Sequence, residues 1–267
     1  MSEAVPPTPA IEVLSADKTY PNGTQALLPV NLSVADGEFV TLLGPSGCGK
    51  STLLKMVAGL LAPSDGRITL WHKPVAQLAE GGRRLSFVFQ SPTLMPWASV
   101  RSNVRLPLDL AGVPSAEADA RVADALALVG LSRFADTLPR ALSGGMQMRV
   151  SIARGLVVDP QLLLMDEPFG ALDEITRHKL DGELLDLWRA KKLTVVFVTH
   201  SIHEAVFLSN RVVMMAARPG RIVEQVVIDE PYPRTPDFMV STQFSQYAKQ
   251  LQDSLLRASV GEDEALA

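Results

Sequence analysis

The segment Gly44–Ser51 constrains the fold of this chain more than any other, because it matches the phosphate-binding pattern Gly-x4-Gly-Lys-Ser/Thr. An apolar, β-branched run at Glu38–Leu43 precedes it, and Lys50–Leu61 carries apolar residues at a 3.6-residue spacing. A strand is therefore expected to enter the loop and a helix to leave it. Glycines let successive backbone N–H groups surround an anion, and the start of a helix adds partial positive charge. The segment predicts a phosphate site in an α/β fold rather than a plain glycine-rich turn.

Individual residues of this loop have distinct expected roles. Lys50 can reach the β- and γ-phosphates of a bound polyphosphate, and Ser51 or its neighbour Thr52 can ligate Mg²⁺. Cys48, the one cysteine of the chain, is interpreted as a small filler rather than a redox sensor, because nothing nearby marks it as reactive. A single cysteine also excludes an internal disulfide. The predicted phosphate-binding residues are Gly44, Pro45, Ser46, Gly47, Cys48, Gly49, Lys50, Ser51 and Thr52.

Composition narrows the class of protein. The 267 residues are 47% hydrophobic and 20% charged, which is typical of a globular chain with a sizeable core. A net charge of -4 gives no indication of a nucleic-acid surface. No apolar run approaches the ~20 residues that span a bilayer, and the N-terminus lacks the pattern of a secretory signal. We expect the protein to stay inside the cell and not to form a channel itself.

Runs of apolar and β-branched residues alternate with helical patterns after Phe39, which favours an α/β fold with a largely parallel sheet. Between Ser91 and Gly155 the strand pattern stops and Ala116–Val129 has helical spacing, so a helical lobe at about 91–155 is expected within the α/β core. The expected strands are Ile11–Leu14, Val30–Val34, Glu38–Leu43, Arg67–Trp71, Leu85–Phe89, Leu162–Met165, Thr194–Thr199, Val212–Met215 and Ile222–Ile228.

The two ends of the chain have a different character. Residues 1–10 contain three prolines and no apolar pattern, which predicts a disordered tail. Tyr20–Gly23 ends in an Asn-Gly step and predicts a turn. From Pro231 onward three prolines precede a helical stretch near Tyr247–Leu256, and the acidic end Glu262–Glu264 follows.

A second candidate site follows the apolar run Leu162–Met165. Asp166 and Glu167 come directly after it, at the carboxyl end of a strand, where α/β proteins bind ligands. Asp166 suits a Mg²⁺ ligand, and Glu167 suits polarising an attacking water. Adjacent residues of a strand point in different directions, so two roles are geometrically reasonable. Alone, such an acid pair is usually a solvated turn, but the phosphate loop makes the functional interpretation the stronger one.

A third motif indicates the family. Leu142–Gln147 reads Leu-Ser-Gly-Gly-Met-Gln, and its Ser143 lies 23 residues before Asp166. This segment resembles the signature sequence of ATP-binding cassette (ABC) ATPases, the nucleotide-hydrolysing subunits of transporters. The resemblance covers about Ile11–Glu230, with every expected motif in order. Tyr20 resembles the aromatic that stacks on adenine, Gln90 the glutamine of the hinge to the helical lobe, Ala171–Asp173 the loop at the dimer interface, and His200 the γ-phosphate-sensing histidine.

The resemblance implies a P-loop NTPase core with a mainly parallel sheet, an N-terminal antiparallel β subdomain and the inserted helical lobe. It places the ATPase domain at residues 11–230 and a C-terminal extension at 231–267. It also implies ATP hydrolysis with ATP and Mg²⁺ as cofactors. The implied catalytic residues are Glu167, His200 and Lys50, the implied metal ligands are Ser51, Gln90 and Asp166, and the implied nucleotide contacts outside the phosphate loop are Tyr20, Gln90, Ser143, Gly144 and Gly145.

Some of these residues have simpler interpretations. Without the resemblance, Tyr20 reads as an ordinary aromatic at the end of a strand and Gln90 as a surface residue. His200 and His203 have a metal-ligand spacing on a helix, but no third ligand accompanies them. The family commonly has Asp where Ser201 follows His200, and often an acid at His203, so these two departures bear on local hydrogen bonding.

The signature has no partner within one chain. In the family that it resembles, two cassettes pack head to tail, so that Ser143–Gly145 of one contact the γ-phosphate held by the other. The implied partners are a second ABC ATPase chain, expected to be an identical copy, transmembrane permease subunits and, indirectly, an extracytoplasmic substrate-binding protein, with no nucleic acid. The implied location is the cytoplasmic face of the inner (plasma) membrane, as a peripheral subunit.

The segment Gln90–Val104 is a candidate socket for a partner helix, because it joins prolines, an exposed-looking Leu94-Met95 pair and Trp97. The alternative is a loop that folds its apolar residues onto the lobe. Together with Met146 and Arg218–Gly220, the Met95-Pro96-Trp97 sequence in this segment resembles the corresponding features of cassettes that drive uptake of nitrate, aliphatic sulfonates or taurine. Importers of vitamin precursors share these features.

The rival function is a soluble ABC ATPase that clamps DNA or ribosomes. Chromosome-type clamps insert a long coiled coil between the phosphate loop and the signature, and only 93 residues (143 - 50) separate Lys50 from Ser143. Ribosome-acting relatives carry two cassettes, and the acidic balance disfavours nucleic acid. A regulatory module without hydrolysis is disfavoured by the presence of both Glu167 and His200.

Overall fold

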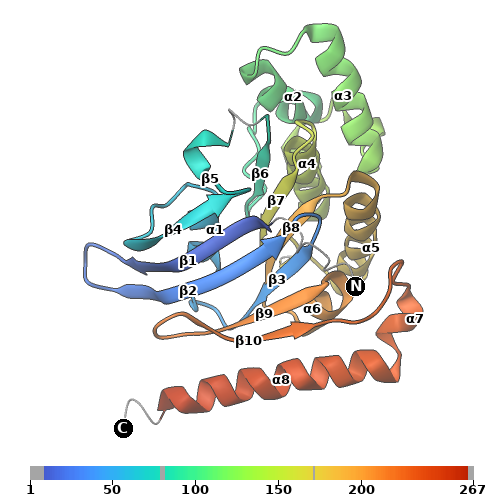
Figure 1. Cartoon of the computed structure of the whole chain (residues 1–267). Helices are drawn as coiled ribbons and strands as arrows, with labels where there is room; N and C mark the ends of the chain where they lie inside the picture. The colour runs from blue at the N-terminus through green and yellow to red at the C-terminus, as the bar shows by residue number, and fades with distance from the viewer. Residues whose placement is uncertain (1–8, 79–81, 171, 264–267) are drawn as a thin grey trace, which may run out of the picture.

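A computed structural model describes residues 9–78, 82–170 and 172–263 of the chain, with two sheets and eight α-helices in these ranges (Figure 1). The first sheet is antiparallel, in the order β2-β1-β4-β5, and the second has the order β10-β9-β3-β8-β7-β6. In the second sheet only the β10–β9 pair is antiparallel, which confirms the mainly parallel core and the antiparallel N-terminal sheet. The strands are β1 Pro9–Thr19, β2 Gln25–Ala35, β3 Phe39–Leu43, β4 Asp65–Leu70, β5 Lys73–Pro74, β6 Leu85–Val88, β7 Leu162–Asp166, β8 Thr194–Thr199, β9 Arg211–Ala216 and β10 Arg221–Val227.

The central strands β3, β7, β8 and β9 of the large sheet are buried on both faces, as their apolar runs require. Along β3 the side chains alternate: Phe39 and Leu43 belong to one hydrophobic cluster, and Val40 and Leu42 belong to another. The first cluster joins the sheet to the helices of the lobe and of the C-terminal half, and the second joins it to α1 and the antiparallel sheet. The central strands are therefore held from both sides, so their carboxyl ends form a rigid edge.

Helices surround this sheet and extend the molecule at one end. Between β6 and β7 the described residues contain helices and no strand, and Figure 1 shows α2 and α3 projecting away from both sheets. The expectation of helical structure between about 91 and 155 is thereby met. The helices are α1 Lys50–Val57, α2 Val100–Leu110, α3 Ser115–Leu128, α4 Gly144–Leu156, α5 Glu174–Lys191, α6 Ile202–Leu208, α7 Pro236–Met239 and α8 Thr242–Asp263.

Several predicted bounds are corrected. The first strand begins at Pro9 rather than Ile11, since Pro9 pairs with Ala35 and Ala10 is fully buried. The rest of the expected tail, residues 1–8, lies outside the described residues. Helix α1 ends at Val57 rather than Leu61, because Gly59 adopts a positive φ of 72° and ends the helical geometry. Helix α8 begins at Thr242, five residues before the expected helical stretch.

The C-terminal segment packs on the core. In Figure 1, α8 runs alongside β10, and Phe238, Phe244 and Leu251 are buried in the cluster that contains Phe39. The guanidinium of Arg234 is buried among backbone carbonyls at the end of α6 and donates to Val206 O, Phe207 O and Ser209 O at 2.9 Å each. Burial lowers the pKa of Arg234, although the charged form keeps these acceptors satisfied.

Replacing Arg234 is expected to destabilise the protein strongly. Arg234→Ala leaves several buried carbonyls without a donor, which costs about 3 kcal/mol of unfolding free energy. Urea denaturation followed by circular dichroism measures this loss. Arg257→Ala, at an arginine that is 75% exposed, is the control with a change below about 0.5 kcal/mol. Equal denaturation midpoints for the two variants would contradict the predicted role of Arg234.

Candidate functional site

The phosphate-binding pattern forms the loop between β3 and α1. Gly49 precedes α1 at a φ of 91°, and no side chain caps the helix start. The first N–H groups of α1 therefore remain available to an anion, and no acidic residue opposes one in the first turn. Gly44 cannot carry a side chain, because a Cβ there would lie 2.4 Å from Met215 O. The loop is thus held closely against β9 while its anion-binding groups stay open.

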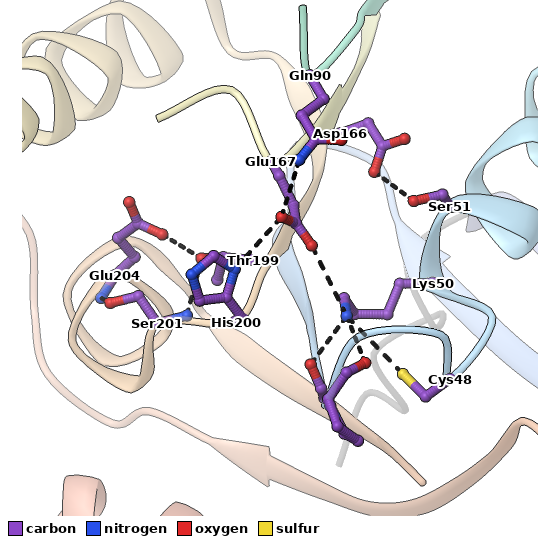
Figure 2. Close-up of polar contacts among 12 residues, drawn as sticks. Cys48, Lys50, Ser51, Gln90, Asp166, Glu167, Thr199, His200, Ser201 and Glu204 are labelled. Carbon is purple, nitrogen blue, oxygen red and sulfur yellow. Dashed lines mark hydrogen bonds and ion pairs between the residues drawn. The ribbon is translucent and has the colours of Figure 1, made fainter. Parts of the chain in front are cut away.

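Lys50 lies inside this loop. Its Nζ donates to Gly44 O at 2.8 Å and to Pro45 O at 2.9 Å, and it lies 3.9 Å from Cys48 Sγ (Figure 2). Burial raises the pKa of the Cys48 thiol, with Lys50 opposing the shift, so the thiol is protonated at neutral pH. This arrangement agrees with the interpretation of Cys48 as a small buried filler.

The acid that ends β7 faces the start of α1. Ser51 Oγ donates to Asp166 Oδ1 at 2.7 Å, although the two residues are 115 positions apart. Burial raises the pKa of Asp166, and the hydrogen bond from Ser51 opposes that rise. A hydroxyl and a carboxylate are the hard oxygen ligands that Mg²⁺ takes, typically with phosphate oxygens and waters completing its shell. The pair Ser51–Asp166 therefore fits a magnesium ion bound beside a phosphate.

The Glu167 carboxylate lies at the centre of the site, close to side chains from other parts of the chain. Its backbone has a φ of 45°, which a non-glycine residue rarely adopts and which turns the side chain out of the strand. Oε1 lies 3.8 Å from Lys50 Nζ, and Oε2 lies 3.3 Å from His200 Nδ1 and 3.4 Å from Gln90 Nε2 (Figure 2). Residues predicted from three other motifs thus converge on the Glu167 carboxylate.

The turn after β8 carries His200 and is held by Thr199 and Glu204, whose roles the sequence interpretation missed. Thr199 Oγ1 donates to Glu204 Oε2 and accepts from Ser201 N at 3.0 Å. Ser201 is the N-cap of α6, since its Oγ accepts from Glu204 N at 3.3 Å. Serine thus provides the cap that the family's common aspartate would provide, and hydrogen bonding beside His200 is intact. The pattern Thr-His-Ser-x-x-Glu, a capping signal after a strand, could have revealed Glu204.

Two sets of predicted site residues, Tyr20 and Ser143–Gly145, lie apart from the residues around Glu167. Tyr20 follows β1 and is 36% exposed. Its backbone hydrogen-bonds to Gly23 and Thr24, and Lys18 Nζ lies over its ring. Ser143 caps α4 and accepts from Met146 N, while Gly144 has open space around it. Among the described residues no hydrogen bond joins Ser143–Gly145 to the loop at 44–52. Ala171, the first residue of the predicted interface loop, lies outside the described residues.

The segment after Gln90 is tied to the signature helix. Arg154 on α4 donates to Pro92 O and Thr93 O at 2.9 Å each. Asn103 on α2 is buried and donates to Met95 O, Ala98 O and Ser99 O. Leu94 is half-buried against the core, so the expectation of an exposed Leu94-Met95 pair is wrong. Trp97 is 78% exposed, whereas Trp71 and Trp188 are buried.

Comparisons with known proteins agree on one family. The family model described as ABC transporter matches residues 27–170. The chain is 48% identical over 210 residues to the taurine import ATP-binding protein TauB of Rhizobium johnstonii, covering 79% of each chain. It is 44% identical over 212 residues to the aliphatic sulfonates import ATP-binding protein SsuB of Bacillus licheniformis, covering 79% of this chain and 81% of that one.

A solved structure extends the likeness to three dimensions. An ATP-binding cassette captured as a dimer in a post-hydrolysis state, bound to ADP and Pi, aligns with a TM-score of 0.73 at 33% identity. The alignment covers 83% of this chain and 100% of that cassette. Separately, the hydropathy of the described helices shows none long and apolar enough to cross a membrane.

Proposed function

The chain belongs to the ABC transporter family, and from this premise we propose that it is the ATP-hydrolysing subunit of an importer for a small anionic nutrient. The observation that carries the proposal is the position of the Glu167 carboxylate, 3.8 Å from Lys50 Nζ and 3.3 Å from His200 Nδ1. Relatives named for taurine and for aliphatic sulfonates favour a sulfonate, with nitrate as a related anion. The net charge of -4 speaks against the alternative of a clamp on DNA or ribosomes.

The loop at 44–52 would hold the triphosphate of ATP. The open N–H groups at the start of α1 surround the β-phosphate, and Lys50 exchanges its loop carbonyls for β- and γ-phosphate oxygens. Tyr20, exposed at the end of β1, is proposed to stack on adenine. Ser51, Asp166 and Gln90 would hold Mg²⁺, which neutralises charge on the phosphates when bound.

Hydrolysis is proposed to use Glu167 as the base. Its carboxylate accepts a proton from the attacking water as the water oxygen bonds to the γ-phosphorus and the bond to the bridging oxygen breaks, which yields ADP and phosphate. His200 lies 3.3 Å from Glu167 and would donate to a γ-phosphate oxygen. Gln90, on the segment leading to the lobe, is placed to align the water with the carboxylate.

The partner is proposed to be a second cassette. Ser143 and Gly144 are exposed and make no hydrogen bond to the loop at 44–52 of their own chain, within the residues described, so they are free to contact a γ-phosphate held by another chain. A related cassette was solved as a dimer bound to ADP and Pi, which supports this arrangement. Closure would exclude water from the phosphates, and loss of the γ-phosphate would let the dimer open.

Transmembrane subunits are proposed to dock at the segment Gln90–Val104. Arg154 and Asn103 hold the backbone of this segment, and the exposed Trp97 offers an apolar anchor for a partner helix. Docking there would place the chain on the cytoplasmic face of the plasma membrane. Residues 11–230, with the helical lobe at about 91–155, would form the ATPase domain, and 231–267 an extension packed on it.

The proposed function predicts a transport-coupled ATPase. The chain assembled with its permease subunits in lipid nanodiscs is expected to hydrolyse ATP severalfold faster when a sulfonate-loaded binding protein is added. Phosphate release measures the rate, with the unloaded binding protein and with nitrate in place of the sulfonate as comparisons. A rate that stays unchanged with every anion would contradict the importer assignment, and a complete lack of ATP hydrolysis would contradict the ATPase assignment.

A further inference from the structure

Two buried carboxyl side chains and one half-buried arginine lie together behind the turn that carries His200. Arg177 and Asp181 come from α5 and Glu204 from α6, and Asp181 and Glu204 are 1% and 4% exposed. Arg177 Nε lies 3.5 Å from Glu204 Oε1. Within the described ranges, Arg177 Nε, Asp181 Oδ1 and Glu204 Oε1 are buried atoms without a hydrogen-bond partner. Arg177 Nε and Glu204 Oε1 face each other in the 3.5 Å ion pair, and Asp181 Oδ1 beside them has no hydrogen-bond partner, which is rare for a buried atom.

The cluster connects the segment that follows Glu167 in the chain to the turn that carries His200. Arg177 Nη2 donates to Leu172 O at 2.8 Å, which holds the segment Leu172–Asp173 at the start of α5. On the other side, Glu204 Oε2 accepts from Thr199 Oγ1, the residue directly before His200. A continuous chain of polar contacts therefore runs from Leu172 through Arg177 and Glu204 to the His200 turn.

We propose that Arg177 is a positioning residue that, through Glu204, couples the placement of His200 to the segment Leu172–Asp173. This inference rests on the proposed function, in which that segment lies at the interface of two cassettes. A partner chain that moves Leu172–Asp173 shifts Arg177, and Arg177 shifts the Glu204–Thr199 contact that sets the His200 turn. Hydrolysis then responds to closure of the dimer.

Asp181 makes the coupling between Leu172–Asp173 and the His200 turn depend on pH. Burial, together with the charge of Glu204, raises the pKa of Asp181 to about 8, with Arg177 opposing. At pH 7 the Asp181 carboxyl is therefore neutral. Burial raises the pKa of Glu204 as well, but the hydrogen bond from Thr199 and the charge of Arg177 oppose that rise, so Glu204 is the carboxyl that pairs with Arg177. Above pH 8 Asp181 ionises, repels Glu204 and competes for the same guanidinium. Arg177, Asp181 and Glu204 line a small cavity. Its other lining residues are Glu174 and His178 on α5, Ser201 at the N-cap of α6, His203 on α6 and Met239 on α7.

The coupling is tested with two variants in the full chain assembled with its permease. Arg177→Lys keeps the cation, but one ammonium cannot serve both Leu172 O and Glu204, and Glu204→Gln keeps an acceptor for Thr199 while removing the charge. Each is expected to lower kcat about three- to thirtyfold with little change in the KM for ATP. The double variant should be no slower than the slower single variant, because both remove one link. Arg189→Lys, at an exposed arginine near the end of α5, is the matched control.

The dependence on pH separates positioning from a merely structural role. Wild-type kcat should fall as pH rises through about 8, and Asp181→Asn should hold the pH 7 rate into the alkaline range. Because the folded state binds the Asp181 proton more tightly than the unfolded chain, wild-type stability falls between about pH 4 and 8. Asp181→Asn should therefore raise Tm at pH 7.

Specific results would overturn this inference. Wild-type kcat in Arg177→Lys and Glu204→Gln, additive losses in the double variant, or an alkaline decline that persists in Asp181→Asn each contradict it while leaving the ATPase assignment intact. A wild-type assembly that does not hydrolyse ATP at all would overturn the proposed function and the coupling with it.

Discussion

Glu167→Gln is expected to lower the rate of ATP hydrolysis by roughly 10²–10⁴-fold while ATP binding is retained. The amide cannot accept the proton of the attacking water, yet it is nearly isosteric and keeps an oxygen near Lys50 Nζ, now 3.8 Å from the carboxylate. With hydrolysis blocked, ATP should hold two chains together. Single-turnover phosphate release measures the chemistry, and size-exclusion chromatography with light scattering measures the dimer.

The matched control is Glu117→Gln, which removes the same charge at an exposed position on α3. Its rate should equal that of the wild type, because the Glu117–Arg121 pair lies on the surface and such pairs contribute little. If Glu167→Gln hydrolysed ATP at the control's rate, Glu167 would not be the base, and a different group would have to accept the proton.

The centre of the site could be predicted from sequence because each part is a short motif at the end of a strand. Lys50 follows β3, Glu167 follows β7 and His200 follows β8. Parallel strands bring their carboxyl ends to one edge, so finding the motifs in an α/β pattern already places these side chains together. The 2.7 Å contact between Ser51 and Asp166 is the direct outcome of that rule.

Other features depend on tertiary contacts that periodicity does not encode. The Arg177–Glu204 pair joins two helices whose polar residues, taken singly, read as solvated faces. The positive φ of Glu167 cannot be inferred from an acid pair after a strand. Burial of Phe244 and Leu251 against the core likewise follows from how α8 packs alongside β10, and the proline-rich segment before it gave no indication of that packing.

Backbone geometry, rather than the spacing of apolar residues, decides where helix α1 ends. The apolar spacing of α1 continues to Leu61, but Gly59 ends the helix and leaves Leu60 exposed. The strand at Thr194–Thr199 was predicted with its observed bounds, because a fully buried β-branched run has sharp polar ends.

Ser143→Arg is expected to abolish ATP-dependent dimer formation while each chain still binds ATP. Ser143 is exposed at the start of α4, and its backbone and that of Gly144 must approach a phosphate closely to donate to it. An arginine side chain fills that space, removes the cap to Met146 N and places a cation at the positive end of the helix. The dimer association constant should fall by at least about 10²-fold, as for other close steric and charge mismatches at an interface.

The effect is cleanest in the Glu167→Gln background, where ATP is not consumed. Light scattering of the double variant with ATP gives the association constant, and fluorescence titration of a labelled ATP gives nucleotide binding by the monomer. Ser143→Ala separates the two causes: it removes the cap, worth about 1 kcal/mol, without adding bulk, so its dimer should weaken far less. Because Ser143 makes no hydrogen bond to the loop at 44–52 of its own chain among the residues described, unimpaired dimer formation by Ser143→Arg would mean that the signature helix does not face a partner's nucleotide.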